Sequence, residues 1–306
     1  MLSMSGRVND SASLRDMRLF KTATGELGEL SNSVHLGAYV CGITPYAAAH
    51  IGHAMVYLTY DLLIRRLRDR GRQVTLVRNV TDVDDSILEY AREHDLDYAD
   101  LAVAEVARFA SEMAQLNIDA PDHEPRATQS IGITVELIQE LEKAGFTYTV
   151  DSDIYSDVAA FGSFGRLSGY PDKLLMALAK ARGDDPARPG KRNPLDFVLW
   201  KAPGFGEPSW DTKLGRGRPG WHVGCTAMSL NALGSTIDVH GGGKDLGSRT
   251  MNASVRSAKQ LPENLSSNIG LIPVSSTTPA KRCLNRWVIW SSSETFCVHM
   301  NPWCCA

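Results

Sequence analysis

Two isolated cysteines are the side chains in this sequence best suited to hold a metal ion. Cys41 and Cys225 stand far apart in the chain, and each lies at the end of an apolar segment that we interpret as a strand. Because the carboxyl ends of parallel strands converge on one crevice, the two thiols could meet there. Two thiolates with a histidine or carboxylate would bind zinc. The alternative is that both cysteines are small buried side chains without chemistry, which is the commoner role.

A pair of histidines, His50 and His53, brackets Gly52 at the point where a strand ends and a helix is predicted to begin. The first N–H groups of a helix have no partner within it, and imidazoles bind phosphate oxygens. Gly52 would let a nucleotide lie against the backbone. The pattern therefore indicates a phosphate site, with a purely structural pair of histidines as the alternative.

Two further segments carry polar or flexible residues after predicted strands. The run Gly241–Gly243, followed by Asp245, could bring backbone close to an adenine or a ribose, or could be an ordinary turn. The segment 81–86, TDVDDS, offers three carboxylates. For this segment we favour a helix cap, with Thr81 as the N-cap residue, over metal or substrate binding.

The elements that would position these residues follow an alternating order. Apolar β-branched patterns predict strands over 36–46 and 73–80, and helical spacing predicts helices over 49–70, 100–116 and 130–144. This order is typical of a doubly wound α/β sheet. We expect an N-terminal extension over 1–36, and an insertion at about 120–200 where Gly, Pro and Asp become frequent.

The composition excludes several classes of protein. The chain has 306 residues, a net charge of −3 and 43% hydrophobic residues, which favours a globular fold over a polybasic nucleic-acid binder. Since no run of about 18 apolar residues occurs, we expect no membrane span. The polar N-terminus resembles no signal peptide, so we expect a cytoplasmic protein.

The motifs YVCGITPY, HIGH, RNVTDVDD, EPRAT, KRNPLDFVLWK, GEPSW, GRPGWHVGC and DVHGGGKDL occur in this order between residues 36 and 246. In this region the chain resembles the class I cysteinyl-tRNA synthetase family, which includes the cysteine:glucosaminyl-inositol ligase of mycothiol synthesis. The resemblance implies a Rossmann-like class I aminoacyl-tRNA synthetase catalytic domain over 37–246, with an inserted subdomain. It also implies that ATP, with Mg²⁺, activates L-cysteine as cysteinyl-adenylate, which then passes to an acceptor.

The same resemblance implies roles for individual residues. Cys41 and Cys225 would be zinc ligands, and zinc would select the substrate thiolate over a serine hydroxyl, which is a poorer ligand. The ATP phosphates would contact His50, Gly52 and His53. The adenosine would lie beside Gly241, Gly242, Gly243 and Asp245, and the substrate cysteine beside Thr44 and Trp221.

The acceptor is not fixed by the resemblance. We place tRNA-Cys first, because every cell needs a cysteine–tRNA ligase. The alternative acceptor is glucosaminyl-inositol, since YLTYD and the segment 168–191 are similar to the mycothiol enzyme, whereas KRNPLDFVLWK is similar to the tRNA synthetase.

The chain departs from the family at two places. Gly224 stands where the family has a glutamate, next to one proposed zinc ligand. After residue 246 the family continues with PHHE, which supplies a third zinc ligand, and with KMSKS, whose lysines stabilise the transferring phosphates. Neither motif follows in this sequence.

The genetic code offers a reason for the second departure. When codons are read from each third base, Thr250–Met251–Asn252 must encode a glutamate inside a permitted PHHEC. In the same frame, Trp287–Val288 must encode a glycine inside a permitted KMSKSLGNLV. We therefore predict that residues 247–306 are an out-of-frame tail that packs poorly. An inactive remnant of the enzyme is a further alternative.

Overall fold

The computed structural model describes residues 17–21, 25–160, 164, 170–181 and 183–243, and the backbone of three short strands nearer the C-terminus. Its first sheet has the order β11-β10-β3-β4, and every neighbouring pair is parallel. The strands are β3 (His35–Ile43), β4 (Gln73–Val80), β10 (Val239–Gly243) and β11 (Gly270–Val274). Helix α1 (Ile51–Asp69) links β3 to β4. The predicted Rossmann-like α/β fold is confirmed.

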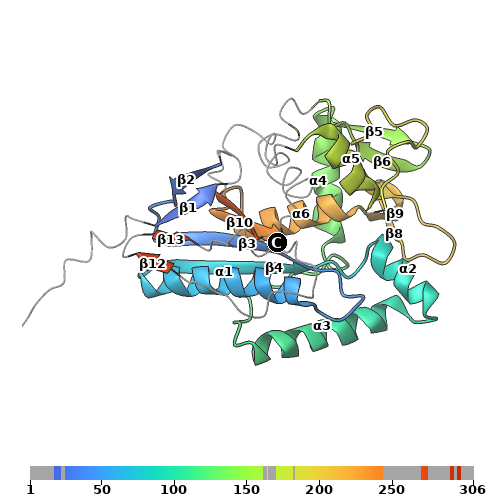
Figure 1. Ribbon diagram of the computed structural model, residues 1–306. Coiled ribbons are helices and arrows are strands. Elements are labelled where there is room, and N and C mark those ends of the chain that lie inside the picture. The colour runs from blue at the N-terminus through green and yellow to red at the C-terminus, as the bar shows by residue number, and fades with distance from the viewer. Residues whose placement is uncertain are drawn as a thin grey trace, which may run out of the picture.

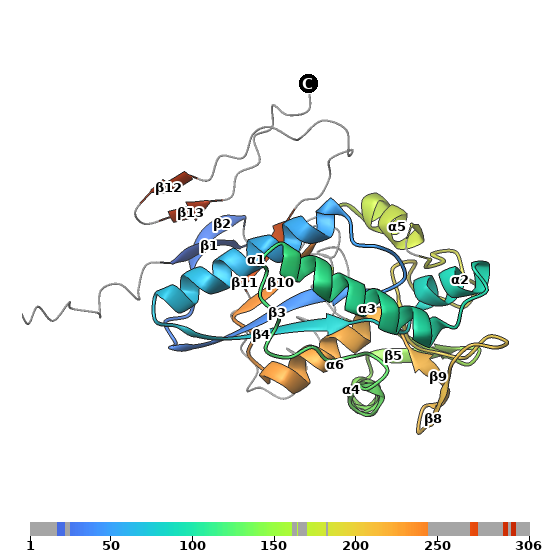
Figure 2. The same cartoon turned by 90° about the horizontal axis from the view of Figure 1, so that it is seen from below.

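The alternation of side chains along β3 divides this sheet into two faces. Ala38 and Val40 point toward α1 and α3 (Tyr98–Gln115), where they join the largest apolar cluster. Tyr39 and Cys41 point the other way and pack with Met228 of α6 (Trp221–Leu233). Figure 1 shows α6 above the strands and α1 and α3 below them, and Figure 2 shows α1 and α3 in the view from below. Odd-numbered positions of β3 therefore face α6 as far as Cys41. An irregularity between Val40 and Ile43 returns Ile43 to the face of α1 and α3.

A second sheet is antiparallel and lies between α4 and α6 in the chain. Its strand order is β5-β6-β7-β9-β8. The strands are β5 (Thr147–Val150), β6 (Asp153–Ser156), β7 (Val198–Lys201), β8 (Trp210–Thr212) and β9 (Gly215–Pro219). Helices α4 (Ile131–Lys143) and α5 (Asp172–Lys180) contribute to its apolar cluster. The predicted insertion at 120–200 overlaps this sheet, whose strands run on to Pro219.

The helix that follows β4 begins later than its sequence predicted. Helix α2 spans Asp85–Glu93, and its N-cap is Asp84, whose Oδ1 accepts a hydrogen bond from the Ile87 N–H at 3.0 Å. The prediction of Thr81 as N-cap is therefore wrong. The Thr81 N–H donates to the Ile43 carbonyl, which holds this residue beside the end of β3 instead.

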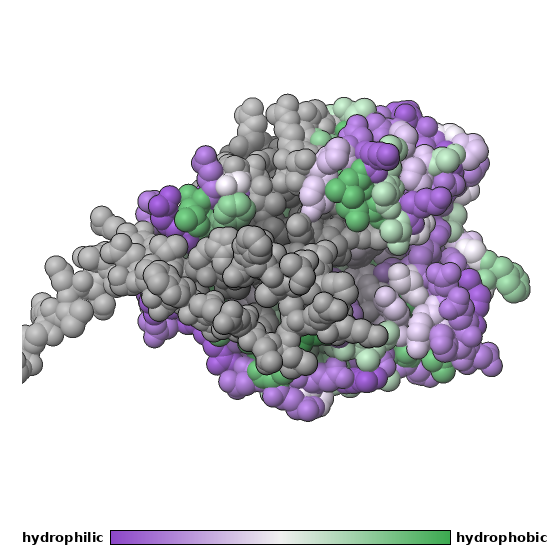
Figure 3. All heavy atoms as spheres, viewed as in Figure 1, coloured by the Kyte–Doolittle hydropathy of each residue, from purple (hydrophilic) through white to green (hydrophobic). Residues whose placement is uncertain are grey.

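Outside these layers, β1 (Arg18–Lys21) and β2 (Glu26–Glu29) form a hairpin within the predicted N-terminal extension. The predicted out-of-frame tail lies outside the described residues except for the backbone of β11, β12 (Trp290–Ser292) and β13 (Thr295–Cys297), so it stays a prediction. Within the described part of the chain, no helix has the length and apolarity to cross a bilayer. On the face seen in Figure 3, the described residues at the surface are mostly hydrophilic, with hydrophobic ones in small groups.

Candidate active site

The two cysteines that lie far apart in sequence are brought together between β3 and α6. Both are buried and free of disulfide bonds. A hydrogen bond with the Cys41 thiol lowers the pKa of Cys225 and outweighs the opposing effect of burial, and a further hydrogen bond with Thr81 acts in the same direction. The prediction that Cys225 ends a strand is wrong. It lies in helix α6, because β9 stops at Pro219 and Gly220 starts the helix.

Strand alternation places three more polar side chains around the thiols. The Cys41 Sγ lies 3.7 Å from His240 Nε2, and the Cys225 Sγ lies 3.7 Å from Asn79 Nδ2. The Tyr39 ring meets His240 edge-on, with ring centres 5.2 Å apart. Burial lowers the pKa of His240 to about 4, so its ring is neutral at pH 7. Its Nδ1 atom is buried and, within the described residues, has no hydrogen-bond partner.

These side chains do not complete a zinc site. The thiol pair has the right donor chemistry, since a neighbouring hydrogen-bond donor favours thiolate at Cys225. A catalytic zinc ion, however, takes about three protein ligands. Among the described residues, no group of three or more His, Cys, Asp or Glu side chains has the placement to hold a metal ion. A third ligand would have to come from elsewhere, so we assign no chemical step to zinc.

His50 and His53 form a reciprocal cap at the start of α1. His50 Nδ1 accepts the Gly52 N–H at 3.0 Å, and His53 Nδ1 accepts the His50 N–H at 3.4 Å. The two rings stack with their centres 4.1 Å apart. Because a neutral imidazole that accepts at Nδ1 carries its proton on Nε2, both rings present an N–H donor on their outer edge. The first turn of α1 has no acidic residue, so this helix end suits an anion.

Thr44 and Trp221 come from the ends of two elements that also carry the thiols. Thr44 follows β3 directly, and its Oγ1 donates a hydrogen bond to Asp84 Oδ2 at 3.1 Å. Burial raises the pKa of Asp84. Trp221 is the first residue of α6 and stacks on His222, with ring centres 5.0 Å apart. Since Trp221 precedes Cys225 by four residues, the two share one face of the helix.

Two of the glycines that end β10 make close contacts with Tyr60, which gives them a structural role. A Cβ atom at Gly241 would lie 2.3 Å from the Tyr60 ring, and the Gly242 N–H donates to the Tyr60 hydroxyl at 2.9 Å. Tyr60 belongs to α1, so these contacts fix β10 to the helix that carries the histidines. The predicted adenosine contacts of Gly241–Gly243 stay predictions, and Asp245 lies outside the described residues.

Sequence reasoning missed three side chains of this site. The sequence patterns give Tyr39, Asn79 and His240 no role beyond their membership of strands and motifs. Side chains on a strand alternate between its two faces, so Tyr39, two residues before Cys41, is expected on the face of that thiol. Asn79, two residues after the buried Val77, is expected on the same face of the sheet. His240 could not be found in this way, because its register depends on the pairing of β10 with β3.

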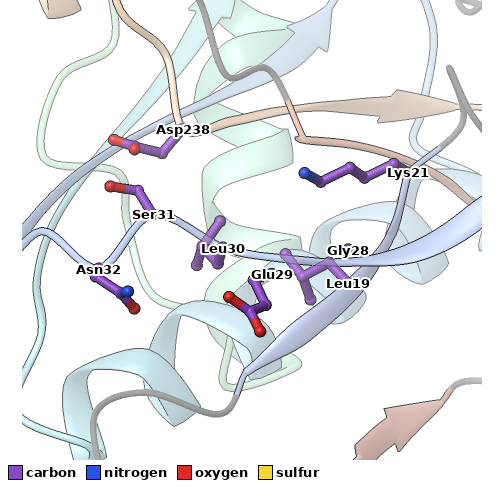
Figure 4. Close-up of a pocket in the computed structure, with 8 residues that line it drawn as sticks. All are labelled: Leu19, Lys21, Gly28, Glu29, Leu30, Ser31, Asn32 and Asp238. Atoms are coloured by element: carbon purple, nitrogen blue, oxygen red, sulfur yellow. The ribbon is translucent and has the colours of Figure 1, made fainter.

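A cavity of about 220 Å³ lies at the opposite end of the strands (Figure 4). It is bounded by the β1–β2 hairpin, the segment after it and Asp238, which directly precedes β10. Ligands of doubly wound sheets bind at the carboxyl ends of the strands, so this cavity is not part of the candidate site. Its lining residues are Leu19, Lys21, Gly28, Glu29, Leu30, Ser31, Asn32 and Asp238.

Comparison with known proteins agrees with this geometry. The family model described as tRNA synthetases class I (C) catalytic domain matches residues 29–250. The chain is 47% identical over 230 residues to the L-cysteine:1D-myo-inositol 2-amino-2-deoxy-alpha-D-glucopyranoside ligases of Streptosporangium roseum and Thermobispora bispora. These matches cover 75% of this chain and 56% and 57% of the relatives. The chain thus spans little more than half the length of the curated relatives it matches.

A solved structure is similar at the level of the fold. Methionyl-tRNA synthetase of Mycobacterium tuberculosis, in complex with methionyl-adenylate, superposes with a TM-score of 0.50 at 18% identity. The similarity covers 73% of this chain and 55% of that one. Since the family model matches residues 29–250, which include most of the described residues, the chain belongs to the class I (C) tRNA synthetase family.

Proposed function

We propose that this chain carries the amino-acid-activating part of a ligase that joins L-cysteine to glucosaminyl-inositol. The observation that carries the proposal is the buried thiol pair between β3 and α6, in a chain 47% identical to ligases with that name. In the first step, a carboxylate oxygen of cysteine attacks the α-phosphorus of ATP, which releases pyrophosphate and forms cysteinyl-adenylate. The acceptor amine then displaces AMP.

The described residues would serve the first step by binding and orientation. The Nε2–H groups of His50 and His53, with the N-terminus of α1, would donate to the phosphates of ATP bound with Mg²⁺. The substrate side chain would bind beside Cys41 and Cys225. Zinc stays a prediction, since it needs a ligand beyond the described residues. A cytoplasmic location is part of the proposal, because a reducing compartment keeps neighbouring thiols unlinked.

For the acceptor, the comparisons favour glucosaminyl-inositol, which was the alternative, over tRNA-Cys, which was our first expectation. The curated relatives named above all carry the glucosaminyl-inositol ligase name, whereas the expectation of tRNA-Cys rested on how common that activity is. A second candidate function is that of an inactive remnant. The sequence favours it, because neither PHHE nor KMSKS follows residue 246 in the frame as it stands.

Cysteine-dependent exchange of pyrophosphate into ATP tests both candidates. The chain as it stands should exchange at a small fraction of the rate of a version whose reading frame is restored after residue 246. The restored version should then transfer cysteine to glucosaminyl-inositol and not to tRNA-Cys. Transfer to tRNA-Cys alone would contradict the proposed acceptor, and no exchange by the restored version would contradict cysteine activation itself.

A further inference from the structure

The only proton of the Thr44 hydroxyl is already used in a hydrogen bond within the protein. Thr44 Oγ1 donates to Asp84 Oδ2 at 3.1 Å. A threonine hydroxyl has one O–H donor and two acceptor lone pairs. With the proton directed at Asp84, the hydroxyl can offer a ligand nothing but its lone pairs. Thr44 therefore presents a hydrogen-bond acceptor to whatever lies beside it.

Asp84 accepts this bond as the cap of a helix, although burial raises the pKa of its carboxyl group. Its Oδ1 accepts the Ile87 N–H at 3.0 Å as the N-cap of α2, and its side chain is buried with 8% exposure. The N-terminus of a helix favours a negative charge. An ionised carboxylate has no proton to donate, so Oδ2 can only accept from Thr44. The bonds from Ile87 and Thr44 act against the effect of burial and favour the ionised carboxylate. The helix cap therefore favours a hydrogen bond that runs from Thr44 to Asp84.

The pair lies next to the thiols. Thr44 is three residues beyond Cys41, and the charge of Asp84 is close enough to influence the Cys225 thiol. An amino acid with its sulfur at the thiol pair would bring its backbone groups toward this end of β3. Of those groups the α-ammonium is a donor and the carboxylate is an acceptor. An acceptor hydroxyl suits the first and repels the second.

We propose that Asp84 is a positioning residue that, through Thr44, makes the site select the α-ammonium group of a thiol-bearing amino acid. This inference rests on the proposed function, because it takes the substrate to be cysteine. It adds that the α-ammonium group of the substrate is recognised and that Asp84 sets the hydrogen-bonding polarity of the site. A hydroxyl free to rotate could donate to a carboxylate just as well, so the selection comes from Asp84.

The test replaces the carboxylate by its amide. In Asp84→Asn the Oδ1 atom can still accept from Ile87, since Asn caps helices as well as Asp does. The Nδ2 group then faces Thr44 and donates to it, which turns the Thr44 proton toward the ligand. The matched control is Asp97→Asn, because Asp97 is the exposed N-cap of α3 and accepts from Ala99 and Asp100.

Titration calorimetry on the full 306-residue chain measures the affinity for three probes that differ in their polar groups. Cysteamine has a thiol and an ammonium group, 3-mercaptopropionate has a thiol and a carboxylate, and L-cysteine has all three. The unmodified chain should bind cysteamine more tightly than 3-mercaptopropionate. Asp84→Asn should weaken cysteamine at least tenfold and leave 3-mercaptopropionate unchanged or tighter, while Asp97→Asn should change neither.

A second variant separates an effect through Thr44 from a direct effect of charge. Thr44→Val keeps the shape and removes the hydroxyl, and it should by itself abolish the preference for cysteamine. Adding Asp84→Asn to Thr44→Val should then cause no further loss, whereas a loss of the same size in both backgrounds would overturn the role through Thr44. If Asp84→Asn fails to fold, as thermal unfolding would show, an unchanged preference in Thr44→Val would overturn the proposal.

The outcomes also separate this inference from the proposed function. An unmodified chain that binds cysteamine, with the same affinity in Asp84→Asn, contradicts the role of Asp84 alone. An unmodified chain that binds none of the three probes contradicts the proposed function, and with it the inference.

Discussion

The ring of Tyr60 on α1 occupies the space that a Cβ atom at Gly241 on β10 would need. The distance would be 2.3 Å to Cζ and 2.4 Å to Cε1, so neither the strand nor the helix could keep its place. Gly241→Ala should therefore destabilise the fold by about 1–3 kcal/mol, the usual cost of overpacking. Urea unfolding followed by circular dichroism measures this change.

Gly224 in α6 provides the matched comparison for this prediction. A Cβ atom there would meet nothing within 4 Å, and alanine is favoured over glycine in a helix by about 0.5–1 kcal/mol. Gly224→Ala should therefore stabilise the chain. Equal effects of the two substitutions would contradict the role of Tyr60 as the neighbour that requires glycine at position 241.

The reciprocal cap predicts that the His50 ring can be lost without loss of the helix. Asparagine is a preferred N-cap, so His50→Asn should leave the thermal midpoint within a few degrees of that of the unmodified chain. Affinity for ATP should fall about tenfold, or about 1.4 kcal/mol, because one N–H donor to phosphate is gone. Competition with a fluorescent ATP analogue measures this affinity.

His35→Asn is the control for the loss of an imidazole. His35 is exposed and begins β3, whereas α1 follows the other end of that strand. This substitution should leave ATP affinity unchanged. A parallel fall in both variants would mean that the two histidines at the start of α1 have no special part in binding phosphate.

An ion-pair cluster ties the second sheet to α2. Asp85 accepts from the buried Arg218 of β9 and from Lys201 of β7. Asp85→Asn should destabilise the chain by about 1–3 kcal/mol, because the buried guanidinium of Arg218 loses one of its two charged partners among the described residues and keeps only Glu207. Asp69→Asn, which breaks an exposed pair with Arg66, should change stability by no more than about 0.5 kcal/mol. Urea unfolding at pH 7 distinguishes the two.

The same cluster has a defined dependence on pH. Burial opposes the shift, but the charges of Arg218 and Lys201 lower the pKa of Asp85 below its usual value. Because the folded pKa is lower than the unfolded one, this stabilisation is complete above about pH 4 and is lost as the pH falls through the folded value. The difference in stability between the unmodified chain and Asp85→Asn should therefore be constant from pH 7 to about pH 5 and shrink as the pH falls further. A difference that grows toward low pH would contradict this assignment.

The chain as it stands and the version with its reading frame restored should differ in how much zinc they bind. The version with its frame restored after residue 246 should hold one zinc ion per chain, and it should lose that ion in Cys41→Ser or Cys225→Ser. The chain as it stands has two of these ligands and should lose zinc to a mild chelator. Metal analysis after dialysis measures both. Zinc retained by the present chain in a Cys41→Ser, Cys225→Ser variant would be held by other groups, such as its four C-terminal cysteines.

Local sequence determined most of the elements of this protein. The strand predicted over 73–80 is β4, and the helices predicted over 100–116 and 130–144 are α3 and α4 within two residues at each end. These segments have a clear period of two or 3.6, and hydrophobic burial acts on that period whatever the neighbours are. The ordered motifs around HIGH also identified the family, since they are local strings.

The tertiary structure decided where the chemical groups meet. The apolar run that contains Cys225 fits a strand or a helix, and only its packing against β3 and β4 makes it a helix. Asp84 became the cap in place of Thr81 because a backbone bond holds Thr81 at the end of β3. His240 reaches Cys41 through the register of β10 with β3, which joins residues about 200 positions apart and leaves no local pattern in the sequence.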